Sequence, residues 1–377
     1  MAQQHPTAIH QYPDFAAFAR DFALTERDLI FTSARTGKAF IGPLGLPCRC
    51  LLRERGGEPA DDEVMLLLLA REALHASLPG GIGRIIAIGG GSVLDIAKVL
   101  AVAPHGTNDV NALYPDMANL TRQHELIALP TTCGTGSEVT NISVIFRTAL
   151  GTKHGLVGDA LYPAHAVLVP QLMEGLPYDV FASSAIDALI HATESFLSPL
   201  ATEQSLARSR EAIAGILTGF AAVAEDPAKL PQLYGHFLRM SLVAGLAFGE
   251  AGCGPVHALS FALGGKYHVP HGESCYQYFL PVLRFYRANR PEGERLQELM
   301  ALLAETLAGM GAPDGLAALE TLLERILPRK PMSAYGAVEA DVAAFAHSTI
   351  ANQQRLLARA YVPLDEAAAL AVEAEGL

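Results

Sequence analysis

The stretch Ile85-Ile86-Ala87-Ile88-Gly89-Gly90-Gly91-Ser92-Val93-Leu94-Asp95 decides the fold class of this chain. Its β-branched apolar run predicts a short buried strand, and the residues after Ser92 predict a helix that reaches about Ala103. Three glycines between the strand and the helix permit a sharp turn and close backbone approach to a ligand. A helix N-terminus favours an anion, so a pyrophosphate is the natural guest. The alternative is a tight turn without a ligand, because the stretch matches neither the Gly-x-Gly-x-x-Gly fingerprint nor a P-loop.

Strands and helices alternate on both sides of this stretch. Apolar, β-branched runs predict strands over residues 28–34, 49–52, 125–129, 139–146 and 166–169, and an amphipathic pattern predicts a helix over residues 61–77. Such alternation implies a parallel sheet covered on both faces. We therefore expect a Rossmann-like α/β domain over residues 1–175.

The second half of the chain has a different pattern. From about Leu176 onward the strand patterns stop, and helices are predicted over residues 177–198, 203–224, 231–249, 295–309, 315–327 and 338–357. We expect an all-helical domain over residues 176–377.

A second turn follows another predicted strand. The segment Leu129-Pro130-Thr131-Thr132-Cys133-Gly134-Thr135-Gly136-Ser137-Glu138 is dense in hydroxyls and glycines, which can hydrogen-bond phosphate, ribose or amide groups. Standing alone, it could be an ordinary polar loop. Two such turns at the carboxyl ends of parallel strands fit the crevice where open α/β sheets bind nucleotides.

One Asp and three His in the second half have spacings that suit a metal ion. Asp187 and His191 are four residues apart on a predicted helix, so they share one face. His257 is expected on a second helix, and His271 in a Pro-Gly loop that folds back. A single His in an apolar helix is more often a packed core residue. One carboxylate and three imidazoles together are a plausible ligand set for a divalent transition metal.

Composition excludes several classes of protein. Of 377 residues, 50% are hydrophobic and 18% charged, which permits a large core and argues against disorder. The net charge of −12 argues against nucleic-acid binding, which needs a basic face. The longest dense apolar run, residues 64–70, is far shorter than the ~20 residues that span a membrane.

Cysteine usage and the first residues predict a cytoplasmic protein. The first 14 residues contain no Lys or Arg and no apolar run, so no secretory signal is expected. The five Cys are odd in number and scattered, which disfavours a disulfide framework. Cys48 and Cys50 are predicted to be buried structural thiols of an apolar strand rather than metal ligands.

Taken in order, the motifs resemble the iron-containing alcohol dehydrogenase family. They are Gly89-Gly90-Gly91-Ser92-x-x-Asp95-x-x-Lys98, Pro130-Thr131-Thr132-x-Gly134-Thr135-Gly136-Ser137-Glu138, Asp187-Ala188-x-x-His191-Ala192-x-Glu194, His257-Ala258 and His271-Gly272. The resemblance implies a dehydroquinate synthase-like architecture, with a Rossmann-like domain followed by a helical one, and a homodimer acting on a small alcohol or aldehyde.

The resemblance also implies roles for individual residues. Gly90, Gly91, Ser92 and Asp95 would hold the cofactor pyrophosphate and nearby groups, and Thr131, Thr132 and Lys153 would contact the nicotinamide cofactor. The residues that would hold Fe²⁺, or Zn²⁺ in some members, and act in catalysis through it are Asp187, His191, His257 and His271.

Two positions depart from the family pattern. Where many members have an Asp that binds the adenosine ribose, this chain has Ser33, with Arg35 nearby, so NAD is the first choice but NADP is not excluded. Where many members have a second His one turn after the third ligand, this chain has Phe261. His268 or a water molecule is the candidate substitute.

The segment of residues 257–273 is most similar to the 4-hydroxybutyrate dehydrogenase branch, which implies interconversion of 4-hydroxybutyrate and succinate semialdehyde. Such a substrate needs a cation for its carboxylate, and Arg147, Lys266 and His268 are candidates. A short-chain alcohol, a diol or another hydroxy acid is the rival substrate.

A dehydroquinate synthase-like lyase is a remote alternative. It is expected to have Glu as its first metal ligand and several basic residues, whereas this chain has Asp187 and few bases near the motifs. A metal-binding protein without enzymatic activity is a further alternative.

Overall fold

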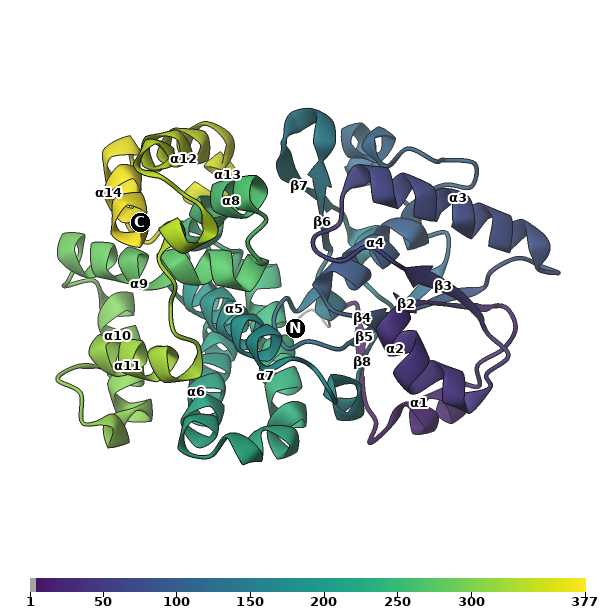
Figure 1. The fold of residues 1–377 in the computed structure, drawn as a ribbon, viewed down its shortest axis with the longest axis horizontal. Helices are drawn as coiled ribbons and strands as arrows, with labels where there is room; N and C mark the ends of the chain where they lie inside the picture. Colours follow the sequence, from purple (N-terminus) through teal and green to yellow (C-terminus); the bar gives the residue numbers. More distant parts are fainter. Residues whose placement is uncertain (1–4) are drawn as a thin grey trace. The chain divides into compact units, whose positions relative to one another are not determined.

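The computed structural model describes residues 5–377 and divides the chain into two compact units, Met1–Leu176 and Pro177–Leu377. The first unit is built on a sheet and the second on helices (Figure 1). Each unit is described by itself below.

The first unit contains a six-stranded parallel sheet of order β1-β8-β5-β4-β2-β3. Its strands are β1 (Ala8–Gln11), β2 (Asp28–Ser33), β3 (Arg49–Arg53), β4 (Arg84–Gly89), β5 (Glu125–Pro130) and β8 (His165–Leu168). The central strand β4 carries the decisive stretch, and its Ile85–Ile88 side chains are fully buried. The prediction of a parallel sheet followed by a helical half is confirmed.

Hydrophobic layers cover both faces of this sheet. Its helices are α1 (Phe15–Asp21), α2 (Ala34–Thr36), α3 (Asp61–Ser77) and α4 (Gly91–Val102). Leu29 and Phe31 of β2 join a core with α3 and α4, whereas Ile30 joins a core with α1. Successive side chains of a strand point to opposite faces, so one strand supplies both cores.

The glycines between β4 and α4 permit close packing. A Cβ on Gly89 would lie 2.5 Å from Val93 of α4, and one on Gly91 would lie 2.5 Å from the side chain of Thr135. Real Cβ atoms do not approach so closely. The glycine turn after β4 and the hydroxyl-rich turn after β5 therefore meet only if Gly91 lacks a side chain.

Two expectations for the first unit are wrong, and one strand was missed. Residues 139–146 are not a strand of the main sheet: β6 (Ile142–Arg147) pairs antiparallel with β7 (Thr152–Val157) in a separate hairpin, whose turn ends at Gly151 with φ +61°. The polar N-terminal residues contain an unpredicted edge strand, β1. Cys50 is exposed and Cys48 only half-buried, because β3 is the other edge strand.

The second unit is all helical. Its helices are α5 (Tyr178–Leu197), α6 (Glu203–Glu225), α7 (Leu230–Ala251), α8 (Pro255–Tyr267), α9 (His271–Asn289), α10 (Glu294–Thr306), α11 (Gly315–Ile326), α12 (Glu339–Asn352), α13 (Gln354–Leu357) and α14 (Glu366–Gly376). Helix α9 and helix α14 were not predicted. The helix expected over residues 338–357 breaks at Gln353, which adopts non-helical backbone angles.

Within residues 5–377, no single helix is long and apolar enough to cross a membrane. Only when taken together do the segments Pro227–Ala251 and Pro255–Tyr267 have the length and apolar composition of a membrane span. They are bent by 105° relative to each other.

Candidate metal centre

Helix α5 carries the first two residues of the predicted metal site. Asp187 and His191 are both almost fully buried, and Asp187 Oδ2 lies 3.9 Å from His191 Nδ1. The His191 ring stacks on Phe248 of α7, with ring centroids 4.3 Å apart. The helical spacing therefore places both side chains on one buried face, as the sequence predicts.

Helix α8 brings His257 to the same carboxylate. His257 Nε2 lies 3.5 Å from Asp187 Oδ1, and its ring stacks on His191 with centroids 4.5 Å apart. On its other side, His257 Nδ1 is 2.6 Å from Glu194 Oε2. Since a carboxylate accepts, Nδ1 carries a proton, which leaves Nε2, facing Asp187, to hold either a second proton or a metal ion.

Glu194 is the residue that sequence reasoning left without a role. Its carboxylate also accepts hydrogen bonds from the backbone N–H groups of Gly254 (2.8 Å) and Val256 (2.6 Å), at the start of α8. Glu194 thus fixes both the N-terminus of α8 and the ring of His257. Its spacing of three from His191 was the available indication, because such residues lie one turn apart on a helix.

The fourth residue, His271, is not in a loop as expected. It is the first residue of α9, and its Nε2 lies 3.8 Å from Asp187 Oδ1. A Cβ on Gly272 would lie 2.3 Å from the Ser183 carbonyl oxygen of α5, so Gly272 permits the close helix contact that presents His271. Gly264 and Gly265, which suggested a loop, lie within α8.

The electrostatics of this cluster suit a cation. Asp187 Oδ1 and His257 Nε2 are buried and have no hydrogen-bond partner among the described residues. Burial alone would raise the pKa of Asp187, but the neighbouring imidazoles hold it well below its usual value. A buried carboxylate oxygen facing an imidazole lone pair costs free energy unless a proton or a metal ion lies between them.

Two cysteines that the sequence analysis did not assign flank the cluster. Cys275 lies one turn after His271 on α9, with Sγ 3.8 Å from both ring nitrogens of His271. Burial raises the pKa of the Cys275 thiol, but His257 and His271 lower it, for a net value of about 7. Cys253 lies near His191 and His257, and burial raises its pKa to about 12.

Phe261, which departs from the family pattern, and its candidate substitute His268 lie in α8 and directly after it. Phe261 packs against the apolar cluster of Phe248, Cys253, Ala258 and Leu356, and its ring centroid is 6.5 Å from that of His271. His268 follows α8 in a left-handed conformation with φ +54°. Its role as a substitute for the missing His stays a prediction.

In the first unit, the predicted cofactor residues gather at the carboxyl ends of β4 and β5. Gly90 precedes α4, with Gly91 and Ser92 in its first turn, and Thr131 and Thr132 follow β5. The Asp95 carboxylate accepts hydrogen bonds from Ser137 Oγ (2.6 Å) and Val144 N (2.9 Å). Asp95 therefore connects the glycine turn to the hydroxyl turn and to β6.

Ser33 lies at the same edge of the sheet, at the carboxyl end of β2 beside β4, whereas Lys153 lies on the separate hairpin. Ser33 ends β2 and caps α2, accepting from Thr36 N at 3.2 Å. Lys153 is buried on β7, with Nζ 2.6 Å from Glu58 Oε1. Their contacts with a cofactor stay predictions.

The first unit also contains a second cluster of imidazoles. His75, His105 and His124 lie together, with His75 and His105 centroids 4.1 Å apart. His75 Nδ1 accepts from Ile82 N at 3.1 Å, so the proton of this ring is on Nε2, where a metal would bind. This cluster is therefore less suited to a metal than the one around Asp187.

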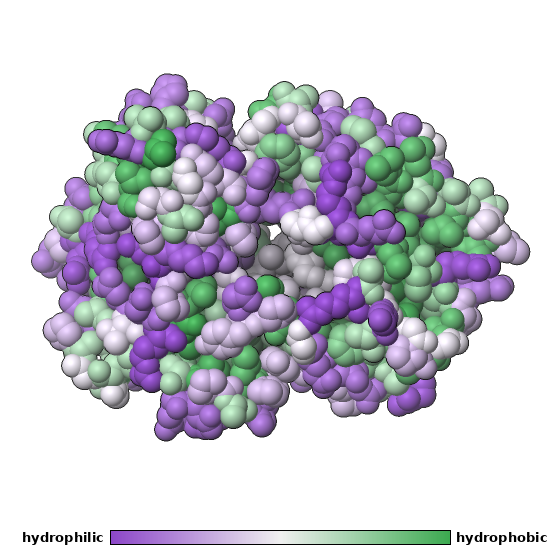
Figure 2. All heavy atoms as spheres, viewed as in Figure 1, coloured by the Kyte–Doolittle hydropathy of each residue, from purple (hydrophilic) through white to green (hydrophobic). Residues whose placement is uncertain are grey.

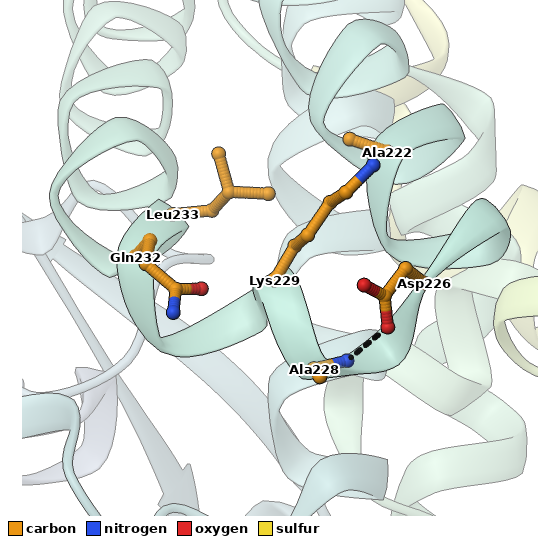
Figure 3. A pocket seen from close by; sticks show the side chains of 6 residues that line it. All are labelled: Ala222, Asp226, Ala228, Lys229, Gln232 and Leu233. Carbon is orange, nitrogen blue, oxygen red and sulfur yellow. Dashed lines mark hydrogen bonds between the residues drawn. The ribbon is translucent and has the colours of Figure 1, made fainter.

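A surface pocket in the second unit carries no comparable chemistry. It is an open hollow at the end of α6 and the start of α7, lined by Ala222, Asp226, Ala228, Lys229, Gln232 and Leu233 (Figure 3). The carboxylate in it, Asp226, caps the adjacent turn by accepting from Ala228 N at 3.0 Å. None of the residues around Asp187 lines this hollow.

A parallel sheet with a glycine turn and a buried carboxylate–imidazole cluster define the class of metal-dependent dehydrogenases. Two family models match the chain: "Iron-containing alcohol dehydrogenase" over residues 25–170 and "Fe-containing alcohol dehydrogenase family, C-terminal" over residues 181–372. The chain belongs to the iron-containing alcohol dehydrogenase family and is an oxidoreductase.

Individual relatives agree with this assignment. The chain is 38% identical to 4-hydroxybutyrate dehydrogenase of Clostridium kluyveri, over 94% of each chain. It is 32% identical to long-chain-alcohol dehydrogenase 1 of Geobacillus thermodenitrificans, over 78% of this chain and 75% of the relative. Its fold is similar to that of sulfoacetaldehyde reductase from Bifidobacterium kashiwanohense in complex with NAD+, with a TM-score of 0.82, 22% identity and coverage of 99% and 97%.

Proposed function

We propose that this enzyme interconverts 4-hydroxybutyrate and succinate semialdehyde with NAD. The single observation that carries this proposal is the 38% identity to 4-hydroxybutyrate dehydrogenase over 94% of both chains. The four-residue cluster around Asp187 supports the reaction class.

The proposed metal ligands are Asp187, His191, His257 and His271, and the proposed ion is Fe²⁺, with Zn²⁺ as the alternative. The donor set fits, because it offers one carboxylate and three imidazoles, with Asp187 Oδ1 and His257 Nε2 buried and unpartnered within the described chain. When bound, such an ion supplies a Lewis acid for the hydroxyl or carbonyl oxygen of the substrate. Glu194 orients His257 and keeps its proton on Nδ1.

The proposed cofactor residues are Gly90, Gly91, Ser92, Thr131 and Thr132, with Ser33, Asp95 and Lys153 as further members. The N-terminus of α4 offers free N–H groups to a pyrophosphate. Asp95 positions the hydroxyl turn through Ser137. With neutral Ser33 at the end of β2, we propose NAD as the preferred cofactor and NADP as an accepted one.

One observation favours the rival substrate, an alcohol without a carboxylate. Lys266 already forms an ion pair with Asp341, and Arg147 donates to Asn111 Oδ1 at 2.8 Å. Of the three cations proposed for a substrate carboxylate, two therefore have structural partners, and His268 is left.

Initial rates with 4-hydroxybutyrate, 1,3-propanediol and 1-butanol, each with NAD and NADP, test the proposal. We expect the highest kcat/KM with 4-hydroxybutyrate and NAD. Equal rates for butanol and 4-hydroxybutyrate would remove the proposed substrate, and activity without nicotinamide reduction would remove the reaction class.

We further propose a cytoplasmic homodimer. In the first unit, α3 exposes Leu66 and Leu69, and apolar side chains are visible over that helix (Figure 2). Exposed apolar side chains that lie together are typical of an interaction surface. Light scattering of the purified protein is expected to give twice the mass of the 40.0 kDa chain, and a monomer mass contradicts the proposal.

A further inference from the structure

Two groups of donor atoms in the described part of the second unit lie close enough to hold an ion, and each combines predicted ligands with a cysteine: Asp187, His257, His271 and Cys275 in one, and His191, Cys253 and His257 in the other. Single donor atoms of Asp187, His257, His271 and Cys275 all lie within 4.8 Å of one another. Two donors on one Zn²⁺ ion are at most about 4.6 Å apart, because the longest of these bonds, to sulfur, is about 2.3 Å. The spacing of Cys275 from the other three donors is therefore close to what one shared ion requires.

We propose that the sulfur of Cys275 is a further ligand of the proposed metal centre, beside Asp187, His257 and His271. This inference rests on the metal centre proposed above. Cys275 is fully buried on α9, and its spacing of four from His271 gives both side chains the same face. Asp187 Oδ1 and His257 Nε2, the two buried atoms without a partner among the described residues, belong to this same group.

The second cysteine, Cys253, lies in a different position. Its sulfur groups with donor atoms of His191 and His257 and not with those of Asp187 and His271. Glu194 contacts the Nδ1 side of His257, whereas Asp187 lies on the Nε2 side. Cys253 is therefore the natural control for Cys275.

A thiolate changes what the site prefers to bind. A thiol that coordinates a metal loses its proton, and a soft thiolate favours Zn²⁺ over harder ions. The alternative is a packed thiol that only donates to Ser260 Oγ, which lies 3.4 Å from Cys275 Sγ. The two cases differ in whether sulfur contributes to the electronic spectrum of the bound metal.

The test is absorption spectroscopy of the full-length enzyme, stripped of metal and reloaded with one equivalent of Co²⁺. Bands in the visible region report that the ion is bound, and a thiolate-to-Co²⁺ charge-transfer band in the near ultraviolet reports sulfur ligation. We expect both in the wild type. Cys275→Ser is expected to lose the near-ultraviolet band and keep the visible bands and one bound equivalent, while Cys253→Ser and the exposed-residue control Cys50→Ser keep both.

Two results overturn the proposal: a wild-type enzyme with visible bands but no near-ultraviolet band, or a Cys275→Ser variant that retains this band. Absence of stoichiometric Co²⁺ binding overturns the metal centre of the proposed function, and with it this inference. As a second readout, the Zn²⁺ affinity relative to Fe²⁺ is expected to fall at least about tenfold in Cys275→Ser, and an unchanged ratio contradicts a sulfur ligand.

Discussion

The two imidazole clusters of this protein are made of the same residue type but have opposite electrostatics. Around Asp187, burial alone would lower the pKa of His257, but the neighbouring Cys275 and Cys253 and the hydrogen bond with Asp187 raise it well above its usual value. In the first unit, burial and the nearby Arg71 lower the pKa of His124 to about 4. One cluster therefore attracts positive charge and the other excludes it.

The difference depends on where the carboxylate lies. Asp187 is inside its cluster, with both oxygens facing imidazoles. In the other cluster, the Glu72 carboxylate contacts one of the three imidazoles, that of His105, at 3.0 Å. It is also paired with Arg71. In this protein the surrounding charges favour a cation at the cluster around Asp187 and not at the cluster of His75, His105 and His124.

Of the substitutions that test this difference between the two clusters, removal of the Asp187 carboxylate is expected to have the largest effect on metal affinity. In Asp187→Asn the buried site loses its negative charge, so metal affinity is expected to fall by more than about 100-fold, beyond the range for an outer-shell partner. Alcohol oxidation falls with it. Elemental analysis and equilibrium dialysis measure the loss, and far-ultraviolet circular dichroism controls for folding. A variant that keeps one tightly bound metal shows that the three imidazoles suffice.

The two outer carboxylates provide a matched pair. Glu194→Gln removes the acceptor that fixes His257, and we expect metal affinity to fall about 10–100-fold. Glu72→Gln makes the same change beside His105 and is expected to leave metal affinity unchanged. Competition with a chromogenic chelator measures both. Equal effects of the two substitutions are incompatible with a single metal centre at Asp187.

The low pKa of His124 predicts that this residue contributes to the pH dependence of the free energy of unfolding. Between its folded value of about 4 and an unfolded value near 6.5, the unfolded chain binds one proton more than the folded chain. The free energy of unfolding therefore falls as pH falls through this range, by about 1.4 kcal/mol per pH unit. In His124→Gln the pH dependence of the free energy of unfolding is expected to decrease by about 1.4 kcal/mol per pH unit, which is the contribution of one proton. Urea denaturation of the metal-free protein at several pH values measures this change. An unchanged slope assigns the proton to another group.

Substitution of the exposed member of the first cluster is expected to have the smallest effect. His105→Ala leaves metal content and activity unchanged and alters stability by no more than about 0.5 kcal/mol, as is usual at surface positions. Metal analysis and thermal unfolding check this. A fall from two bound metal ions to one shows that the cluster of His75, His105 and His124 is also a metal site.

Sequence patterns predicted most of the fold because its helices and strands depend on local contacts. The apolar run before Gly89 predicted β4, and the spacing of Asp187 and His191 predicted their shared face on α5. Where local patterns were weak, prediction failed: β1 is polar and short and forms only because it pairs with β8. Residues 139–146 have strand character, but nothing local determines that they pair with β7 rather than with the main sheet.

By itself, the sequence determined the parallel sheet, the glycine turn and four candidate ligands, because periodicity and glycine placement are properties of neighbouring residues. Only the tertiary structure decided that His271 begins a helix, that Glu194 orients His257, and that Cys275 lies beside Asp187. These contacts join residues that are far apart in the chain. Their energetics depend on burial and on which charges meet, and both arise only when the helices pack.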